Sequence, residues 1–253
     1  GRSGIIYFSS KKKADDIAGR IREMTHLKAE SYHSDVDPID KKKIQAQFLK
    51  NELDIICATS AFGMGIDKPD IRYVIHYHLP ANPEMYLQEI GRASRDKTGG
   101  IALLLYEQGD EYLQSRLQEE SLPEASELRY AYKHPKALEA LKDDNKARLA
   151  KYFIEQKIDL NEALIRIEAR NEYKKKQLKI MVRYAETTGC KRELLLNYFN
   201  EELKVRPEEC CSSCTSHLPL PYIRESALNV KEREQAWEVI LNKLFNFQEQ
   251  TKN

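Results

Sequence analysis

The sequence has no apolar run long enough to cross a membrane, and it has no phosphate-binding loop of the form G-x-x-x-x-G-K-[ST]. A transmembrane helix needs about 20 consecutive apolar residues, whereas 32% of these 253 residues are charged. The chain starts on a strand-like run, GIIYFSS, in place of a charged leader and an apolar segment. We therefore expect a soluble, cytoplasmic protein that makes no membrane contact. Any nucleotide that it uses must be held by a phosphate loop from elsewhere.

Cysteine is scarce, and the net charge is close to zero. Four of the five cysteines crowd into residues 190–214, whereas Cys57 stands alone in an apolar run. Clustered cysteines in a chain without an export signal favour a metal site over disulfides. The net charge of +1 hides a basic stretch, because residues 128–207 contain nineteen Lys and Arg against twelve Asp and Glu. Such a stretch can attract a polyanion, although on charge alone a solvated helical surface is the simpler explanation.

Apolar runs alternate with amphipathic segments through the first hundred residues. The expected strands cover residues 4–8, 29–35, 54–60, 71–79 and 99–106, and the expected helices cover residues 12–24, 39–52 and a segment that starts at Asn82. Strands that alternate with helices predict a doubly wound α/β lobe, with a parallel sheet of four or five strands and helices on both faces. Residues 124–186 have the apolar period of several further helices.

Polar residues follow three of the expected strands. Ser9 and Ser10 follow the first strand, His33 follows the second, and Thr59 and Ser60 follow the third. The carboxyl ends of parallel strands share one edge of a sheet, which is the usual ligand-binding edge of such lobes. Hydroxyl groups and free backbone N–H groups there could bind phosphodiester oxygens without reading bases. Each residue also fits ordinary turn chemistry or a structural role, so the combination along one edge carries the prediction.

The segment QEIGRASRD, residues 88–96, places two arginines three residues apart. Asn82 can cap a helix that runs through this segment, and Pro83 suits its first position. Three side chains would then share one face of that helix, namely Gln88, Arg92 and Arg95. Two guanidinium forks on one face could clamp a polyphosphate, and a solvated basic helix end is the alternative. Arginines without a phosphate loop of their own act as arginine fingers where the loop lies on another domain or chain.

Four segments together resemble the second motor lobe of the RecQ DNA helicases, in order and in spacing: GIIYFSS, YHSD, ATSAFGMGIDKPDIRYVIHYHLP and YLQEIGRASRD. The resemblance is close over residues 3–115 and resumes over residues 174–214. It implies a RecA-like lobe over residues 1–115, a mainly helical zinc-binding domain with an inserted helical segment over residues 116–217, and a short tail over residues 218–253. The first motor lobe of the family, with the phosphate loop and the magnesium ligands, would precede this segment.

The resemblance also implies roles for the nucleotide-binding residues. Arg95 would be the arginine finger on the γ-phosphate of ATP, and Arg92 and Gln88 would couple the nucleotide state to closure of the lobes. Asp67 and Gly65 would complete the ATP contacts of this lobe. ATP and Mg²⁺ would bind only together with the first lobe, so this chain alone would be inactive as an ATPase. Relatives often carry glycine where Ser94 stands, which leaves both arginines in place.

The DNA contacts implied by the resemblance lie in two places. Single-stranded and partly duplex DNA would run along the polar strand ends and along a lysine-rich helix, with contacts to Ser9, Ser10, His33, Thr59, Ser60, Lys175 and Lys179. Such contacts are independent of base sequence, as a translocating motor requires. Movement from 3′ to 5′ follows from the family alone.

The cysteine region, from CKRELLLNYF to EECCSSC, resembles the RecQ zinc-binding module. The implied ligands of a structural Zn²⁺ are Cys190, Cys210, Cys211 and Cys214. The adjacent pair Cys210 and Cys211 departs from the usual spacing, and neighbouring side chains point apart in an extended chain. Joint ligation therefore needs a kinked backbone, and His217 is a possible substitute ligand.

The expected molecule is a monomer that works with the first helicase lobe of the same protein. The residues also allow two other functions. A non-enzymatic nucleic-acid-binding or regulatory module that reuses the lobe is the alternative. An RNA motor of a related family is a third possibility, which the cysteine cluster disfavours. The inserted helices over residues 124–173 have no assigned role.

Overall fold

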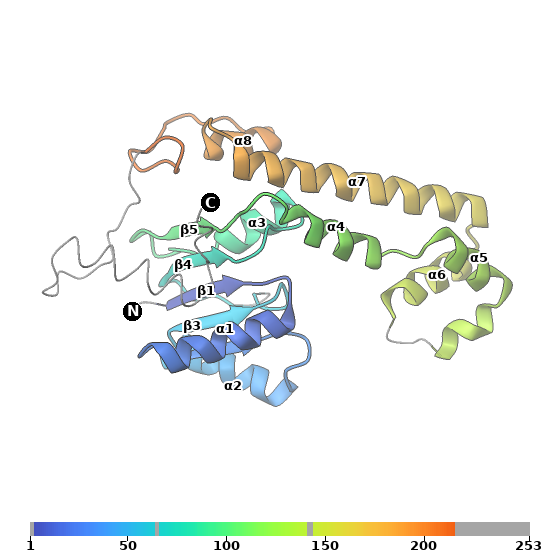
Figure 1. Cartoon of the computed structure of the whole chain (residues 1–253), viewed down its shortest axis with the longest axis horizontal. Helices are drawn as coiled ribbons and strands as arrows, with labels where there is room; N and C mark the ends of the chain where they lie inside the picture. The colour runs from blue at the N-terminus through green and yellow to red at the C-terminus, as the bar shows by residue number, and fades with distance from the viewer. Residues whose placement is uncertain (1–2, 64–65, 141–143, 216–253) are drawn as a thin grey trace, which may run out of the picture. The chain divides into compact units, whose positions relative to one another are not determined.

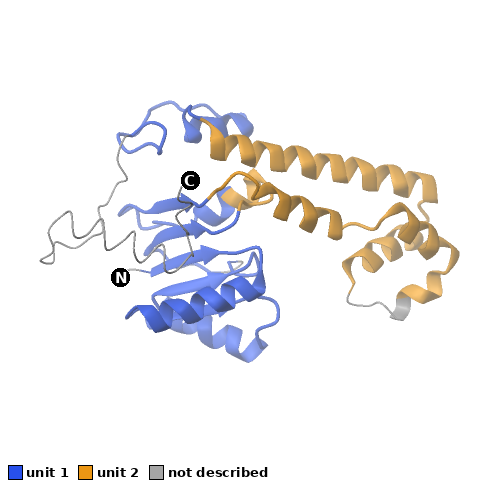
Figure 2. Cartoon of the chain, in the orientation of Figure 1, with its two compact units in different colours: residues 1–78, 87–105, 188–253 blue, residues 79–86, 106–187 orange. Residues whose placement is uncertain are grey.

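The structure is a computed structural model that describes residues 3–63, 66–140 and 144–215. The chain forms two compact units (Figure 2), the first made of residues 1–78, 87–105 and 188–253 and the second of residues 79–86 and 106–187. None of the helices in the described ranges is long and apolar enough to cross a membrane. The domain boundaries expected from the sequence stay a prediction.

The first unit contains a parallel sheet of five strands in the order β2-β3-β1-β4-β5. Figure 1 shows β1, β3, β4 and β5 side by side. The strands are β1 (Ser3–Tyr7), β2 (Ala29–Tyr32), β3 (Ile55–Ala58), β4 (Ile71–His76) and β5 (Ile101–Leu104). The crossover order and the parallel pairing confirm the expected doubly wound α/β fold.

Helices cover both faces of this sheet, as the sequence predicted. The helices of the unit are α1 (Lys11–Met24), α2 (Pro38–Leu49), the end of α3 (Pro83–Ile90) and α8 (Lys191–Tyr198). Alternate residues of β1 point to opposite faces. Ile6 packs with Ile17 of α1 in one apolar cluster, whereas Ile5 packs with Phe48 of α2 in the other. Each such side chain, when fully buried, contributes about 1.5–3 kcal/mol to folding.

The register of the strands brings their polar carboxyl ends to one edge. Tyr7 pairs with Ala58 of β3 and with His76 of β4, and Tyr32 of β2 also pairs with Ala58. The chain beyond each strand therefore leaves the sheet at the same level. The backbone N–H of Thr59 donates to the carbonyl of Tyr32, which keeps the loops after β2 and β3 adjacent.

The second unit is helical, as expected for residues 124–186. Its helices, beyond the start of α3, are α4 (Glu111–Glu120), α5 (Ala125–Lys133), the 3₁₀ helix η1 (Pro135–Ala140), α6 (Asn145–Glu155) and α7 (Leu160–Glu186). Leu128, Phe153 and Ala163 belong to a small apolar core shared by α5, α6 and α7. The carboxylate of Asp159 accepts hydrogen bonds from the first backbone N–H groups of α7 and fixes its start.

Candidate functional site

The segment that carries the two arginines is a helix end followed by a turn. Asn82 caps α3 as expected, because its Oδ1 accepts from the backbone N–H of Met85 at 2.7 Å. The helix ends at Ile90, so the prediction that Gln88, Arg92 and Arg95 share one helical face is wrong. Ser94 has a φ of 54°, in the left-handed region, and its N–H donates to the carbonyl of Ile71 in β4. This turn separates the two guanidiniums.

Arg95 lies on the surface and forms an ion pair with Asp67. Its Nη1 is 2.7 Å from Asp67 Oδ1, and the side chains are 41% and 85% exposed, respectively. The two residues expected at the nucleotide thus lie together, although they are 28 positions apart. An exposed pair of this kind is worth only about 0.2–1 kcal/mol, so a polyphosphate could displace the carboxylate. Gln88 is exposed on α3, and Gly65 lies outside the described residues.

Arg92 is buried, in contrast to Arg95. Its side chain is 7% exposed, and its Nη1 donates to the carbonyl of Gly63 at 2.6 Å. Gly63 has a φ of 138°, and a Cβ there would lie 2.3 Å from the guanidinium. Only glycine therefore fits this position. The sequence prediction of two arginines aimed at one target is not what the structure shows, because Arg92 is directed into the loop after β3.

Asp96 anchors the turn that carries Arg95. Its carboxylate is paired with both terminal nitrogens of Arg72 in β4, and it also accepts from the hydroxyl of Thr98 at 2.8 Å. The hydrogen bonds from Arg72 hold the pKa of Asp96 well below its ordinary value. A two-pronged arginine–carboxylate contact fixes orientation as well as distance. Nothing in the sequence indicated this role for Arg72, because a polar residue in a strand is usually an ordinary surface position.

We expect Asp96→Asn to lower the stability of the chain at neutral pH. A carboxylate whose folded pKa is depressed stabilises the protein above its ordinary pKa of about 3.9, and this contribution is lost as the pH falls below that value. The urea midpoint of the variant should therefore fall below that of the wild type at pH 7, and the difference should shrink at pH 3. Asp40→Asn, which removes an exposed pair with Lys43, is the matched control. Equal midpoints of Asp96→Asn and wild type at pH 7 would contradict the anchor.

A buried lysine fixes the loop on the other side of Asp67. Lys68 is 2% exposed, and its Nζ lies 2.7 Å from Asp70 Oδ1 and 2.7 Å from Asn51 Oδ1. The ammonium also lies over the ring of Phe48, 5.4 Å from its centroid. Burial raises the pKa of Asp70, but the hydrogen bond from Lys68 outweighs it, so the net shift is downward. A lysine in a polar turn carries no sequence signal of burial, and sequence reasoning missed it.

A buried histidine–glutamate pair joins β4 to α3. His76 Nε2 is 2.7 Å from Glu89 Oε2, and both side chains are buried. The alternation of β4 could have revealed His76, because it shares the inward face with Val74. Glu89 follows the buried Tyr86 by three residues, so helical periodicity could have revealed it too. The pair ties the carboxyl end of β4 to the helix that leads into the arginine segment.

The hydroxyl residues at the strand ends differ in how they are used. Ser10 caps α1, because its Oγ accepts from the N–H of Lys13 at 3.3 Å. The backbone N–H of Ser9 donates to His78 Nδ1 at 3.1 Å. Thr59 is partly exposed and Ser60 is exposed. The structure thus brings these residues to one edge, with Ser60 the most accessible of them.

His33 lies at the same edge but is nearly covered. Its side chain is 6% exposed, and its Nε2 is 3.0 Å from Asp15 Oδ1. Burial raises the pKa of Asp15, but hydrogen bonds from Ser31 and His33 outweigh it, so the carboxyl stays below its ordinary value. His33 therefore joins the start of α1 to the end of β2, and little of its ring is available to a ligand.

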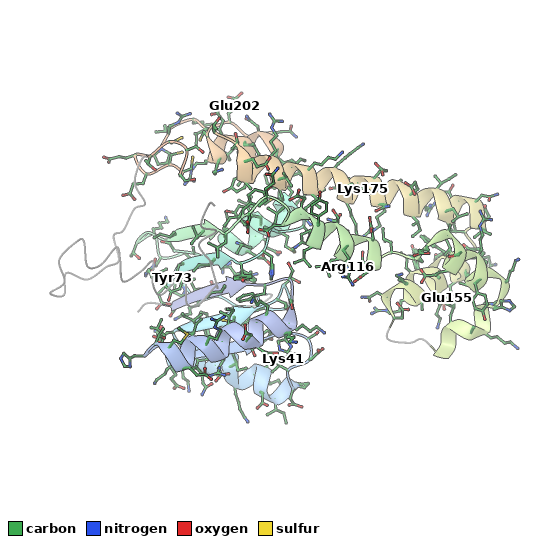
Figure 3. All side chains as sticks on the ribbon, viewed as in Figure 1. Lys41, Tyr73, Arg116, Glu155, Lys175 and Glu202 are labelled. Carbon is green, nitrogen blue, oxygen red and sulfur yellow. The ribbon has the colours of Figure 1, made fainter. Side chains whose placement is uncertain are left out.

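The expected lysine contacts lie on α7, in the second unit. Lys175, Lys179 and Arg183 recur every four residues and are exposed, so they form one stripe on the helix. Figure 3 labels Lys175 on this helix, and its Nζ is 3.0 Å from Glu172 Oε1. Gln177, by contrast, is buried. An exposed stripe of cations at this spacing can follow a chain of phosphates.

The four clustered cysteines meet at one point in the first unit. Their sulfur atoms all lie within 4.8 Å of one another, with 3.6 Å between Cys190 and Cys210 and 3.5 Å between Cys211 and Cys214. A disulfide requires about 2.05 Å. Four sulfurs about 2.3 Å from a tetrahedral zinc would be separated by about 3.8 Å. The spacing therefore fits a closed zinc site.

The backbone explains how adjacent cysteines reach the same point. Turns flank the pair Cys210 and Cys211, and the N–H of Cys214 donates to the carbonyl of Cys211 at 2.9 Å. Burial raises the pKa of Cys211, but backbone N–H groups, that of Lys191 first, outweigh it and lower the pKa to about 6. Cys190 sits at the N-cap of α8, where its Sγ accepts from the backbone N–H of Glu193 at 3.5 Å. His217 lies outside the described residues.

Two family descriptions match the chain. Residues 1–97 match the helicase conserved C-terminal domain, and residues 144–216 match the RecQ zinc-binding family. The second match contains all four clustered cysteines, and the first contains the whole arginine segment up to Asp96.

Curated relatives with similar sequences are named as DNA helicases. The probable ATP-dependent DNA helicase RecS of Bacillus subtilis (strain 168) is 33% identical over 97% of this chain and 52% of its own length. The ATP-dependent DNA helicase RecQ of Pasteurella multocida (strain Pm70) is 32% identical over 85% of this chain and 27% of its own. Among solved structures, a DEAD box protein from Methanococcus jannaschii is 30% identical to this chain. The match covers 46% of this chain and 31% of that protein, with a TM-score of 0.40. The chain spans about half the length of RecS and about a quarter of the length of the Pasteurella RecQ protein. It belongs to the RecQ family of helicases, with the helicase C-terminal domain followed by the RecQ zinc-binding region.

Proposed function

We propose that this chain is the second motor lobe and zinc module of an ATP-dependent DNA helicase that moves from 3′ to 5′. The observation that carries the proposal is the position of Arg95, which is exposed and held only by the exposed carboxylate of Asp67. In the family, the phosphate loop lies on a first lobe, and none occurs in this sequence. The chain alone is therefore inactive as an ATPase.

Arg95 acts when the first lobe presents a nucleotide. In the closed state the guanidinium leaves Asp67 for the γ-phosphate, where it stabilises the charge that develops during transfer to water. Asp67 is then free to contact the ribose side of ATP. Hydrolysis removes the γ-phosphate, the guanidinium returns to Asp67, and the lobes separate. The exchange costs little because both side chains are exposed.

The DNA contacts of the lobe are the hydroxyl and N–H groups at the ends of β1 and β3. Ser60 and Thr59 supply the accessible contacts. Beside them, Ser9 is held through its backbone N–H and Ser10 caps α1 with its hydroxyl. His33 positions the end of β2 and does not itself meet the strand, because its ring is buried. The exposed stripe of Lys175 and Lys179 on α7 adds sequence-independent charge.

Cys190, Cys210, Cys211 and Cys214 are the ligands of a structural Zn²⁺. By holding the ion together, these four sulfurs would tie the start of α8 to the loop over residues 208–215. The lowered pKa of Cys211 favours the thiolate form of that ligand.

Reconstitution with the first lobe tests the proposed function. The chain alone is expected to hydrolyse no ATP, whereas the chain joined to the first helicase lobe of its own protein is expected to hydrolyse ATP in response to single-stranded DNA. Duplex unwinding of a substrate with a 3′ overhang, but not of one with a 5′ overhang, checks the direction. A folded, two-lobed protein that binds DNA and shows no hydrolysis would support the non-enzymatic module instead.

A further inference from the structure

A buried tyrosine and a buried arginine together hold two neighbouring carbonyl groups of the loop after β3. Tyr7 Oη donates to the carbonyl of Phe62 at 3.3 Å, and Arg92 Nη1 donates to the carbonyl of Gly63 at 2.6 Å. The two side chains are also neighbours, because the charge of the Arg92 guanidinium lowers the pKa of Tyr7 and partly opposes the effect of burial. Burial raises the pKa of Tyr7, so its hydroxyl keeps the proton that it donates.

The loop that they hold connects the proposed DNA contacts with the proposed nucleotide contacts. On one side, the N–H of Phe62 donates to the carbonyl of Thr59 at 3.0 Å. On the other side, the carbonyl of Gly63 also accepts from the N–H of Ile66 at 3.2 Å, one residue before Asp67. The two held carbonyls thus lie between the DNA-facing hydroxyl and the partner of Arg95.

The same two residues are buried, so they are poorly placed to meet a ligand directly. Tyr7 is 4% exposed and stacks on His76, with ring centroids 5.3 Å apart. Arg92 is three positions before Arg95 in the same turn. A shift of the loop at Gly63 would therefore strain its bond to the guanidinium of Arg92, and through Arg92 it would act on the turn that carries Arg95.

We propose that Tyr7 and Arg92 are positioning residues that couple DNA contact at Thr59 and Ser60 to the placement of Arg95. This inference rests on the proposed motor function. Arg92 acts through the loop after β3, and not as a second clamp on the phosphates. DNA stimulation of ATP hydrolysis passes through the two carbonyl contacts.

Tyr7→Phe in the two-lobed protein tests the coupling. The change removes the hydroxyl and keeps the ring, so the packing on His76 remains. We expect ATP hydrolysis without DNA to stay within about twofold of the wild type and the DNA-stimulated kcat to fall about tenfold, the loss expected when one hydrogen bond of such a network is removed. Single-stranded DNA should bind with unchanged affinity, because the DNA-facing groups remain. The KM for ATP should not change.

Tyr32→Phe is the matched control. Tyr32 is also a buried core tyrosine, and its ring contacts Phe62 with centroids 4.8 Å apart. Its hydroxyl, however, accepts from Gln45 Nε2 at 2.8 Å and not from the coupling pair. We expect Tyr32→Phe to keep the full DNA stimulation. An equal loss in both tyrosine variants would show general loosening of the core and would overturn the inference.

A double-mutant cycle supplies the second measurement. DNA contact at Thr59 that is transmitted through Tyr7 is lost only once. The double variant Thr59→Ala with Tyr7→Phe should therefore lose no more DNA stimulation than the single variant with the larger loss. Additive losses would overturn the coupling, as would a Tyr7→Phe protein with wild-type stimulation or with equal losses in the presence and absence of DNA. A wild type that shows no stimulation at all would overturn the motor function, and with it this inference.

Discussion

Arg95→Ala is expected to abolish ATP turnover in the two-lobed enzyme while leaving the fold intact. An arginine finger is typically worth 10³ to 10⁵ in rate, so kcat should fall by about three orders of magnitude or more. The fold should be unaffected, because Arg95 is exposed and its ion pair with Asp67 stabilises little. Steady-state ATP hydrolysis with saturating single-stranded DNA measures the first effect, and the urea midpoint measures the second.

The control for this prediction is another arginine in an exposed ion pair. Arg116 is 78% exposed and lies 2.8 Å from Glu120 on α4, so Arg116→Ala removes the same chemistry elsewhere. It should turn over ATP like the wild type. Arg95→Lys is expected to recover little activity, since an ammonium lacks the planar fork. A kcat of Arg95→Ala within tenfold of the wild type, with folding intact, would remove Arg95 from the catalytic site.

Loss of the zinc site should have the largest effect on stability. The purified chain should contain one zinc ion, and Cys190→Ser or Cys210→Ser should lose it. Because metal binding to such a site is also folding free energy, each variant and the chelated wild type should unfold the segment over residues 190–215 at a lower temperature. Metal analysis and thermal unfolding with and without a chelator measure the two effects.

Two further variants make the zinc test specific. Cys57→Ala should keep full zinc content, because Cys57 is buried in β3 and burial raises the pKa of its thiol. His217→Ala should also keep it, since the four clustered sulfurs are enough for a four-coordinate zinc site. A well-folded wild type without zinc, or a Cys210→Ser protein that keeps its zinc, would contradict the four-cysteine site.

The sheet and its helices could be predicted because their signals are periodic. Ile17 and Ile21 of α1 repeat with the helical period, and β3 is a short apolar run that a parallel sheet buries on both faces. The end of α3 could not be predicted in the same way. The apolar positions Ile90 and Ala93 continue the helical pattern and both pack against the core, but the helix ends at Ile90 and Ala93 lies in the turn that follows. Ser94 lies in the left-handed region four residues after the end of the helix, and it turns the chain toward β4.

The sequence predicted which residues lie together at the candidate site, but it did not predict that Arg92 is buried. Arg95, Asp67 and the four cysteines were expected as groups, and the structure brings each group together. Arg92 was expected beside Arg95 because a helix continued through this segment would place both on one face. Its burial depends on Gly63, 29 positions earlier, and no local pattern encodes that contact. The burial of Lys68 could not be predicted for the same reason, because its partner Asn51 is 17 positions away.

A structure of the two-lobed enzyme with single-stranded DNA and ADP–aluminium fluoride tests the central claim most directly. The aluminium fluoride stands for the phosphoryl group in transfer. The account predicts that the Arg95 guanidinium has left Asp67 and lies within hydrogen-bond distance, about 3 Å, of a fluoride. Arg92 should remain on the carbonyl of Gly63. An Arg95 still paired with Asp67 and remote from the nucleotide would contradict the account.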